Sequence, residues 1–356
     1  VLMIPIAGSI GKIELAADRP MQPASTMKLL TTAAALDLLG SNWRGQTQIL
    51  VQNADQRRQT LSAPLILQGR SNTDLSYGEL NFMLQQLYDQ GVRHIPAGLQ
   101  IDRTSFNPAR PSGQQEPFDE APRSRYNHVP DPLMLQQNMH WLSLQSDGGN
   151  IRGWFSPGWQ NVQLDLSELK LISGPCDLFS IHQQKITVLP HAQRQWRLSV
   201  SGEFPANCQW AGQLELFDRD LNLQLAVQHY WRQLGGTIGD AVLYQKTAPE
   251  SQLLVQHLGR PLPEIIYRVN KYSDNALARL LYANLADVGQ PANTSSQQPT
   301  QAAADQQTAL WLHHNQISTT GLIIDNGSGL SRTARISARQ LADILKASWS
   351  SRFSTE

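Results

Sequence analysis

Residues 23 to 28 read Pro-Ala-Ser-Thr-Met-Lys, and a run of leucine, alanine and threonine follows from Leu29 to Leu39 and ends at Gly40. Good helix formers fill this run, so the segment predicts a helix that begins close to Ser25. Ser25 and Lys28 are three positions apart, so they lie on one helix face within roughly one turn of each other. The pair is therefore a candidate nucleophile and base.

The chemistry of the two side chains favours this interpretation. A serine hydroxyl becomes a good nucleophile only when an adjacent base accepts its proton. Lysine can be that base once burial or a neighbouring cation favours its neutral form. A serine at a helix N-terminus also lies beside unpaired backbone N–H groups, which can stabilise an oxyanion. Position and partner thus both predict that Ser25 and Lys28 are catalytic.

The same Ser-x-x-Lys pattern recurs at Ser167 and Lys170, so one copy is a chance match. The second copy is followed by Leu-Ile-Ser-Gly-Pro, in which Gly and Pro stop any helix from extending. We therefore expect the second copy to be the chance match.

Length and composition bound the class of protein. A chain of 356 residues suits two or three domains. Its formal net charge is zero and Lys and Arg are dispersed, which argues against a nucleic-acid partner. Cys and His show no zinc-type spacing, so no metal or other cofactor is expected.

The termini and the apolar stretches bear on location. No apolar stretch reaches the ~18 residues that a transmembrane segment needs. The chain starts at Val1 without an initiating Met or a charged leader, which predicts a mature chain or a trimmed fragment.

The chain has two cysteines, Cys176 and Cys208, separated by segments rich in β-forming residues. A disulfide between them is plausible, and two buried free thiols are the alternative. The sequence alone leaves both open.

Periodicity gives a coarse outline of the chain. Residues 1–6 and 12–16 are expected to pair as strands, and a small β module is expected over 147–214. Further strands are predicted at 47–51, 63–67 and 98–102, and helices at 79–91, 221–234 and 338–348. Residues 107–132, rich in proline, predict a long and often functional type of loop, and 290–307, poor in apolar residues, predict a mobile loop.

Ser273-Asp274-Asn275 opens a second helical pattern, and Ser-x-Asn also occurs at Ser105 to Asn107. The simplest interpretation of Ser or Asp at such a position is a helix N-cap. In acyl-transfer sites of the Ser-x-x-Lys type, however, a second serine relays a proton to the leaving amine, and an asparagine amide holds the substrate and the lysine. Because the segment Ser273-Asp274-Asn275 follows the first motif in the sequence, we favour these roles for Ser273 and Asn275.

Three segments carry a family resemblance: Pro-Ala-Ser-Thr-Met-Lys with the run after it, Asn-Lys-Tyr-Ser-Asp-Asn at 270–275, and Gly-Ser-Gly-Leu-Ser-Arg at 327–332. In this order, with a large insertion between the first two, they resemble the D-alanyl-D-alanine carboxypeptidase/endopeptidase family of class C low-molecular-mass penicillin-binding proteins, peptidase family S13. The resemblance spans essentially the whole chain.

The resemblance implies an α/β fold, namely a penicillin-recognising domain of the serine transpeptidase/β-lactamase-like kind with two nested, mostly β inserted domains. The outer domain would comprise residues 1–45 and 246–356. The first inserted domain would comprise 46–146 and 215–245, and the second 147–214.

The resemblance also implies a function: a serine-type D-Ala-D-Ala carboxypeptidase or DD-endopeptidase acting on peptidoglycan stem peptides in the bacterial periplasm. Ser25 would carry the acyl group, and β-lactam antibiotics would be covalent inhibitors. Pro-Phe-Asp-Glu at 117–120 is similar to a segment that sends an acidic residue toward the amino group of the substrate's diamino-acid side chain. Asp119 is thus a candidate substrate-binding residue, with a solvated loop acid as the alternative.

One family feature is missing. The family carries a third motif, Lys-Thr-Gly or similar, and no Lys-Ser/Thr-Gly occurs here; Lys246-Thr247-Ala248 precedes the Ser-x-Asn motif and is not expected to replace it. The chain ends at Glu356, before the region where the family places that strand, so truncation is the expected explanation. Two rival functions therefore remain: a β-lactamase-like hydrolase, against which the long insertion argues, and a non-catalytic peptidoglycan-binding fragment.

Overall fold

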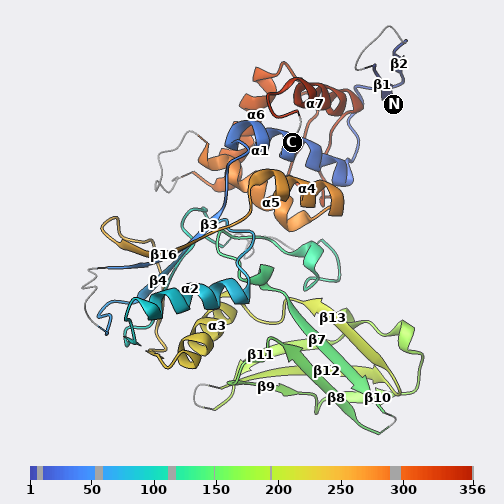
Figure 1. The fold of residues 1–356 in the computed structure, drawn as a ribbon. Coiled ribbons are helices and arrows are strands. Elements are labelled where there is room, and N and C mark those ends of the chain that lie inside the picture. Colours follow the sequence, from blue (N-terminus) through green and yellow to red (C-terminus); the bar gives the residue numbers. More distant parts are fainter. Residues whose placement is uncertain are drawn as a thin grey trace.

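The computed structural model describes residues 1–5, 11–52, 59–110, 118–147, 149–192, 195–288 and 298–354. Figure 1 shows a helical region built from both ends of the chain, a sheet region with two helices beside it, and a β region built from the middle of the chain.

The helical region brings segments from both ends of the chain together (Figure 1). Its helices are α1 (Met27–Leu39), α4 (Leu262–Tyr272), α5 (Asn275–Asn284), α6 (Thr300–His314) and α7 (Ala338–Ser350). They share one buried apolar cluster, which includes Met27, Leu30 and Leu281. A short antiparallel pair, β1 (Leu2–Met3) with β2 (Ile13–Glu14), precedes α1. Helix α1 thus packs against helices that lie more than two hundred positions away in the sequence.

The second region is a mixed five-stranded sheet of order β15-β6-β4-β3-β16. Its strands are β3 (Gln46–Val51), β4 (Leu65–Arg70), β6 (Leu99–Asp102), β15 (Val242–Tyr244) and β16 (Gln252–Leu258), and its helices are α2 (Tyr77–Asp89) and α3 (Arg219–Gln233). A parallel pair, β5 (His94–Ile95) with β14 (Thr237–Ile238), accompanies it. Strand β6 runs parallel to both β4 and β15, whereas β3 is antiparallel to β4 and β16.

The third region consists of two sheets. One is antiparallel, of order β13-β7-β8, with β7 (His140–Ser146), β8 (Ile151–Ser156) and β13 (Gln209–Leu214). In the other, β12 (Trp196–Pro205) pairs with β9 (Val162–Asp165), β10 (Leu169–Ile172) and β11 (Lys185–Pro190). A disulfide joins Cys176 to Cys208, which resolves the alternative that the sequence left open.

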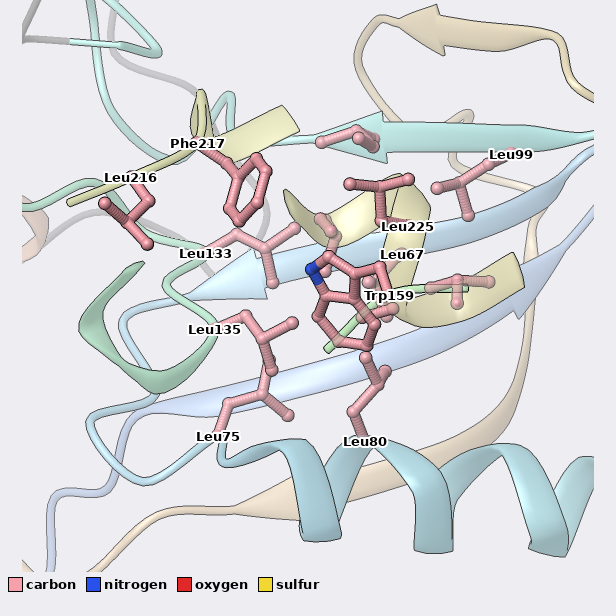
Figure 2. Close-up of a cluster of buried hydrophobic side chains, with 14 of the residues drawn as sticks. Leu67, Leu75, Leu80, Leu99, Leu133, Leu135, Trp159, Leu216, Phe217 and Leu225 are labelled. Carbon is pink, nitrogen blue, oxygen red and sulfur yellow. The ribbon is translucent and has the colours of Figure 1, made fainter. Parts of the chain in front are cut away.

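One tryptophan connects the β region to the sheet region. Trp159 lies between β8 and β9, is only 3% exposed, and packs its ring edge-on against Tyr77 of α2 at 5.4 Å between ring centroids. Figure 2 shows its indole among leucines such as Leu67 of β4 and Leu225 of α3. Burial of so large a side chain contributes a few kcal/mol, roughly 3–5 by the cost of truncating such residues. The β region is therefore anchored in the core of its neighbour.

A buried ionic cluster holds the loop that leads toward the helical region. Asp131 accepts from Arg103 at 3.1 Å and from Arg219 at 2.9 Å, and its side chain is fully buried. Breaking a buried pair leaves an uncompensated charge, which is costly, so the cluster fixes the backbone around residue 131. The segment just before it contacts α5, because Arg279 of that helix donates to the carbonyl oxygens of Asn127 and His128.

Most predicted elements are present: the strands at 1–6 and 12–16 pair, and the predicted helices at 79–91, 221–234 and 338–348 correspond to α2, α3 and α7. The predicted mobile loop at 290–307 is wrong from Thr300 onward, where α6 begins; residues 289–297 lie outside the described ranges. Alanine and glutamine form helices well despite low hydrophobicity. Ala303 and Ala304 are buried, and Thr300 exchanges two hydrogen bonds with the backbone of Asn107, which fixes the start of the helix.

The division into three nested domains stays a prediction. Strand pairing would move two of its boundaries, because β16 at 252–258 pairs with β3 of the sheet region and β7 at 140–146 pairs with β8 and β13. Over the described ranges, none of the helices combines the length and apolarity that crossing a membrane requires.

Candidate active site

Ser25 and Lys28 lie where a short 3-10 turn, Ala24–Thr26, runs into α1. Ser25 is exposed, whereas Lys28 is buried at 2% exposure, and the Lys28 Nζ lies 3.2 Å from the Ser25 Oγ. The preceding residue, Ala24, has a φ of 47°, a left-handed conformation that is unfavourable for a residue with a Cβ. A turn of this kind presents the serine at the surface and leaves the lysine below it.

The surroundings of Lys28 define its chemistry. Besides Ser25, its Nζ donates to the Oδ1 of Asn275 at 2.7 Å and to the carbonyl oxygen of Ser328 at 2.7 Å. A neutral amine has two N–H groups and one lone pair. If the two N–H groups serve Asn275 and Ser328, the lone pair is directed to the third partner, the Ser25 hydroxyl. The geometry therefore suits proton transfer from Ser25 to Lys28.

Electrostatics act in the same direction. The pKa of Lys28 is lowered to about 8, chiefly by burial; the Asp274 carboxylate opposes this by raising the pKa, and the nearby cation Arg279 contributes a smaller lowering. A base with a pKa near the working pH is the most efficient kind, because it is substantially neutral and still binds a proton well.

The Ser-x-Asn segment divides its roles among three residues. Ser273 ends α4 with a φ of 56°, and Asp274 is the N-cap of α5, where its side chain accepts from the N–H of Leu277 at 3.0 Å. The N-cap interpretation thus applies to Asp274 and leaves Ser273 for another role. The Ser273 Oγ lies 2.7 Å from the Ser25 Oγ.

The glycine-rich turn at 325–332 packs against the backbone beside Ser25 and contacts Lys28. A Cβ on Gly329, whose φ is 77°, would lie 1.8 Å from the carbonyl oxygen of Ala24, so only glycine fits against the backbone beside Ser25. The turn's Gly327 carbonyl also accepts from Thr31 of α1 at 2.6 Å. The sequence singled out this turn but did not indicate that the Ser328 carbonyl would bind the lysine.

The loop before residue 131 contributes two contacts that the sequence did not indicate. The Asn275 Nδ2 donates to the carbonyl oxygen of Tyr126 at 3.2 Å, and Arg125 pairs with Asp274 at 2.9 Å. A backbone carbonyl carries no residue-type signal, so no pattern could have identified Tyr126. Together these contacts orient the Asn275 amide with Oδ1 toward Lys28.

Comparison with known proteins decides the family. Residues 7–356 match the model of the D-Ala-D-Ala carboxypeptidase 3 (S13) family. The chain belongs to this family.

Relatives and solved structures agree with this assignment. Over 353 residues the chain is 24% identical to the D-alanyl-D-alanine carboxypeptidase DacB of Haemophilus influenzae, covering 96% of this chain and 70% of that protein. Over 336 residues it is 25% identical to the D-alanyl-D-alanine carboxypeptidase of Actinomadura sp. strain R39, covering 91% of this chain and 59% of that protein.

The chain also superposes on the crystal structure of penicillin binding protein 4 (dacB) from Haemophilus influenzae, with a TM-score of 0.73 at 20% identity, covering 94% of this chain and 72% of that one. A structure of the same protein complexed with a β-lactam gives a TM-score of 0.72. The expected family and fold class are confirmed, and the family's activity is that of a serine D-Ala-D-Ala carboxypeptidase.

In this S13 chain, Asp119 is held by residues of its own loop, one of which, Tyr126, also accepts from Asn275 through its carbonyl oxygen. Its carboxylate accepts from the Tyr126 hydroxyl at 2.8 Å, the Asn127 Nδ2 at 2.7 Å and the Ala121 N–H at 3.0 Å. The Tyr126 bond is the main cause of its lowered pKa, so the group is ionised at neutral pH. The structure thus places Asp119 as an anion held by its own loop.

A cavity of about 550 Å³ opens beside this loop of the S13 chain. It is charged: Arg219, Arg279 and Arg332 line it together with Glu215 and Asp325. Its lining includes Phe118 but not Asp119, and Arg332 donates to the Phe118 carbonyl at 3.0 Å. The Asn127 Oδ1, also at its wall, is buried and has no hydrogen-bond partner among the described residues.

Lys246 and Thr247, which resemble the first two residues of the missing third motif, have a structural role in the S13 chain. Both the N–H and the hydroxyl of Thr247 donate to the Asp102 Oδ2, at 2.8 and 2.5 Å. Lys246-Thr247-Ala248 therefore belongs to the sheet region, beside β6, and does not substitute for a third motif. No group of His, Cys, Asp and Glu in the part of the chain that the structure describes could hold a metal ion.

Proposed function

We propose that Ser25 is the acyl-carrying nucleophile of this S13 chain and that it cleaves the peptide bond before a terminal D-alanine, or a D-alanyl cross-link, in peptidoglycan stem peptides. One observation carries the proposal: the buried Lys28 Nζ binds Ser25, Asn275 and the Ser328 carbonyl at once, while the Ser273 hydroxyl contacts the Ser25 hydroxyl. The family assignment supplies the substrate class.

The acylation step follows from these contacts. The Ser25 Oγ gives its proton to the Lys28 Nζ and forms a bond to the carbonyl carbon of the substrate, producing a tetrahedral oxyanion. When the intermediate collapses, the C–N bond breaks and the leaving amine receives the proton that Lys28 had accepted, relayed through the Ser273 hydroxyl, which lies 2.7 Å from the Ser25 Oγ. The ester on Ser25 is then hydrolysed by water.

Two further groups assist this step. The N–H of Ser25 lies at the start of a 3-10 turn, where the first N–H groups have no partner within the turn, so it can donate to the oxyanion. Asn275 keeps Lys28 in place through its Oδ1, and it would orient the substrate peptide through its amide.

Asp119 is proposed to bind the amino group of the substrate's diamino-acid side chain. Its ionised carboxylate and its loop, which borders the charged cavity, support this role. β-Lactams would acylate Ser25 and leave a slowly hydrolysed adduct. The Cys176–Cys208 disulfide supports an oxidising, exported location, for which the periplasm is the proposed compartment.

Labelled penicillin tests the proposal. After incubation with the full chain, peptide mapping should find the label on Ser25. Ser25→Ala should abolish labelling, whereas Ser167→Ala, in the second Ser-x-x-Lys, should leave it unchanged. Absence of label on Ser25 in the folded protein would overturn the acyl-enzyme proposal and favour a non-catalytic peptidoglycan-binding protein.

The rates of deacylation then separate peptidase from β-lactamase-like activity. A peptidase should deacylate faster after a D-Ala-D-Ala peptide than after penicillin. The opposite ranking would favour the β-lactamase-like alternative.

A further inference from the structure

The antiparallel sheet β13-β7-β8 has two contrasting faces. Along β7, buried and more exposed residues alternate strictly: Leu142 and Leu144 are buried, whereas Trp141 is 50% exposed. Trp154 of β8 is 56% exposed. Large aromatic side chains on a solvent face are unusual in a sheet whose other face already fills the core, and they mark sites of interaction.

Strand register places the two tryptophans on the same face. Trp141 is opposite Ser156, and Trp154 is opposite Ser143, so the two indoles occupy diagonal positions of neighbouring strands. Diagonal neighbours lie about 7–8 Å apart, within reach of aromatic side chains. We call this surface the tryptophan face; its other members are Ser143, Gln145, Arg152, Ser156, Gln209, Ala211 and Gln213.

The composition of the tryptophan face indicates the kind of partner. Serine hydroxyls and glutamine amides surround the two indoles, and the face carries one charged side chain, Arg152, which pairs with Asp147 at 3.5 Å. An indole ring offers an apolar surface on which the C–H face of a sugar ring can stack, and amides and hydroxyls bind sugar hydroxyl and acetamido groups. The face therefore suits an uncharged polar polymer such as a glycan.

The tryptophan face continues toward the candidate active site. Gln213 of β13, opposite Trp141, also lines a second cavity of about 270 Å³. Arg125 lines the same cavity and pairs with Asp274, the residue that follows Ser273. In Figure 1 the loop before β7 lies between the helical region and the β region. A polymer bound along the face can thus extend through the cavity toward the nucleophile.

We propose that the tryptophan face binds the glycan strand of peptidoglycan and so positions its stem peptides for cleavage at Ser25. This inference rests on the proposed function for its substrate class. It assigns to Trp141 and Trp154 a binding role that is separate from the chemistry, because neither residue contacts the Ser25 cluster in the described structure.

Binding to soluble, peptide-free glycan strands tests the inference. The full chain should bind them with a change in tryptophan fluorescence. Trp141→Ala with Trp154→Ala should weaken binding at least about tenfold, as expected for aromatic residues at the centre of a contact. Trp349→Ala is the matched control, since Trp349 at the end of α7 is 64% exposed but lies in the helical region; it should bind as the unaltered chain does.

Three outcomes would overturn the inference: no binding of glycan strands by the unaltered chain, equal binding by the double variant, or an equal loss in Trp349→Ala. The first outcome is also what a protein partner for this face would produce. Trp141→Phe, which keeps an aromatic ring, should retain more affinity than Trp141→Ala and guards against misfolding of the double variant. Penicillin labelling of Ser25 should be the same in every variant, so a failure here is distinguishable from a failure of the proposed reaction.

Discussion

Ser25–Lys28 and Ser167–Lys170 share one four-residue pattern in two very different environments. Ser25 and Lys28 lie at the start of α1, and the lysine is buried among partners from residues 275 and 328. Ser167 lies in the turn between β9 and β10, where its N–H donates to Asp165 at 3.0 Å, and Lys170 is an exposed residue of β10. The spacing brings serine and lysine together only where the backbone is helical, and only burial makes the lysine a useful base.

The two Ser-x-Asn segments differ in the same way. Asn275 binds Lys28 through its side chain. Asn107 uses its backbone N–H and C=O to hold Thr300 at the start of α6. Each motif therefore has an internal control in the same chain, and the following four predictions use these controls in order of decreasing effect.

Replacing Lys28 and replacing Lys170 should give the largest difference in acylation rate. Lys28→Ala removes the proposed base and should slow acylation by labelled penicillin about 10²–10⁴-fold, the usual contribution of general-base catalysis. Lys170→Ala should leave the rate unchanged. Similar losses in both variants would mean that burial and helical geometry do not distinguish the two copies.

The pH dependence of acylation should follow Lys28. As the proposed base, Lys28 can accept a proton only in its neutral form, and its pKa is about 8, so the rate should rise roughly tenfold per pH unit below pH 8 and level off above it. Between pH 6 and pH 8 the rise is therefore on the order of fifty-fold to a hundred-fold. Lys170→Ala should show the same profile. The rate is measured by quenching reactions with labelled penicillin at a series of times. An acylation rate that does not change from pH 6 to pH 9 would exclude Lys28 as the base.

Replacing Asn275 and Asn107 should give a smaller difference in acylation rate than replacing the two lysines. Asn275→Ala removes one hydrogen bond to the Lys28 amine, and loss of such a bond to a chargeable group costs about 1.5–3 kcal/mol, or roughly ten-fold to a hundred-fold in acylation rate. Asn107→Ala should keep the rate within about twofold, because its backbone bonds to Thr300 remain. An equal effect of the two substitutions on the rate would contradict the contrast between the segments.

Asp274→Asn should produce the smallest change. Its carboxylate raises the pKa of Lys28, so its removal should shift the midpoint of the pH profile to lower pH, by less than about one unit. Asparagine is also a good N-cap, so α5 should keep its start. Asp165→Asn, beside the second Ser-x-x-Lys, should leave the midpoint in place. A shift of Asp274→Asn toward higher pH would contradict the electrostatic account.

Much of the fold was predictable from local signals. Helices α2, α3 and α7 have apolar residues at helical spacing, and α7 begins at Ser337 with a capping box. Helix α6 was missed at its start, because alanine and threonine pack tightly while contributing little hydrophobicity. The position at which α6 begins is fixed by neighbouring residues such as Asn107, and not by the sequence of the helix itself.

The sequence by itself determined the candidate nucleophile and base, their candidate partners Ser273 and Asn275, and the family to which the chain belongs, because residue type and spacing encode them. Only the tertiary structure decided which groups surround these side chains. The Ser328 and Tyr126 carbonyls are backbone groups without a residue signal, and they join the site from 300 residues after Lys28 and 149 residues before Asn275. The lowered pKa of Lys28 likewise arises from burial among distant segments, a property of the folded packing that no short stretch of sequence contains.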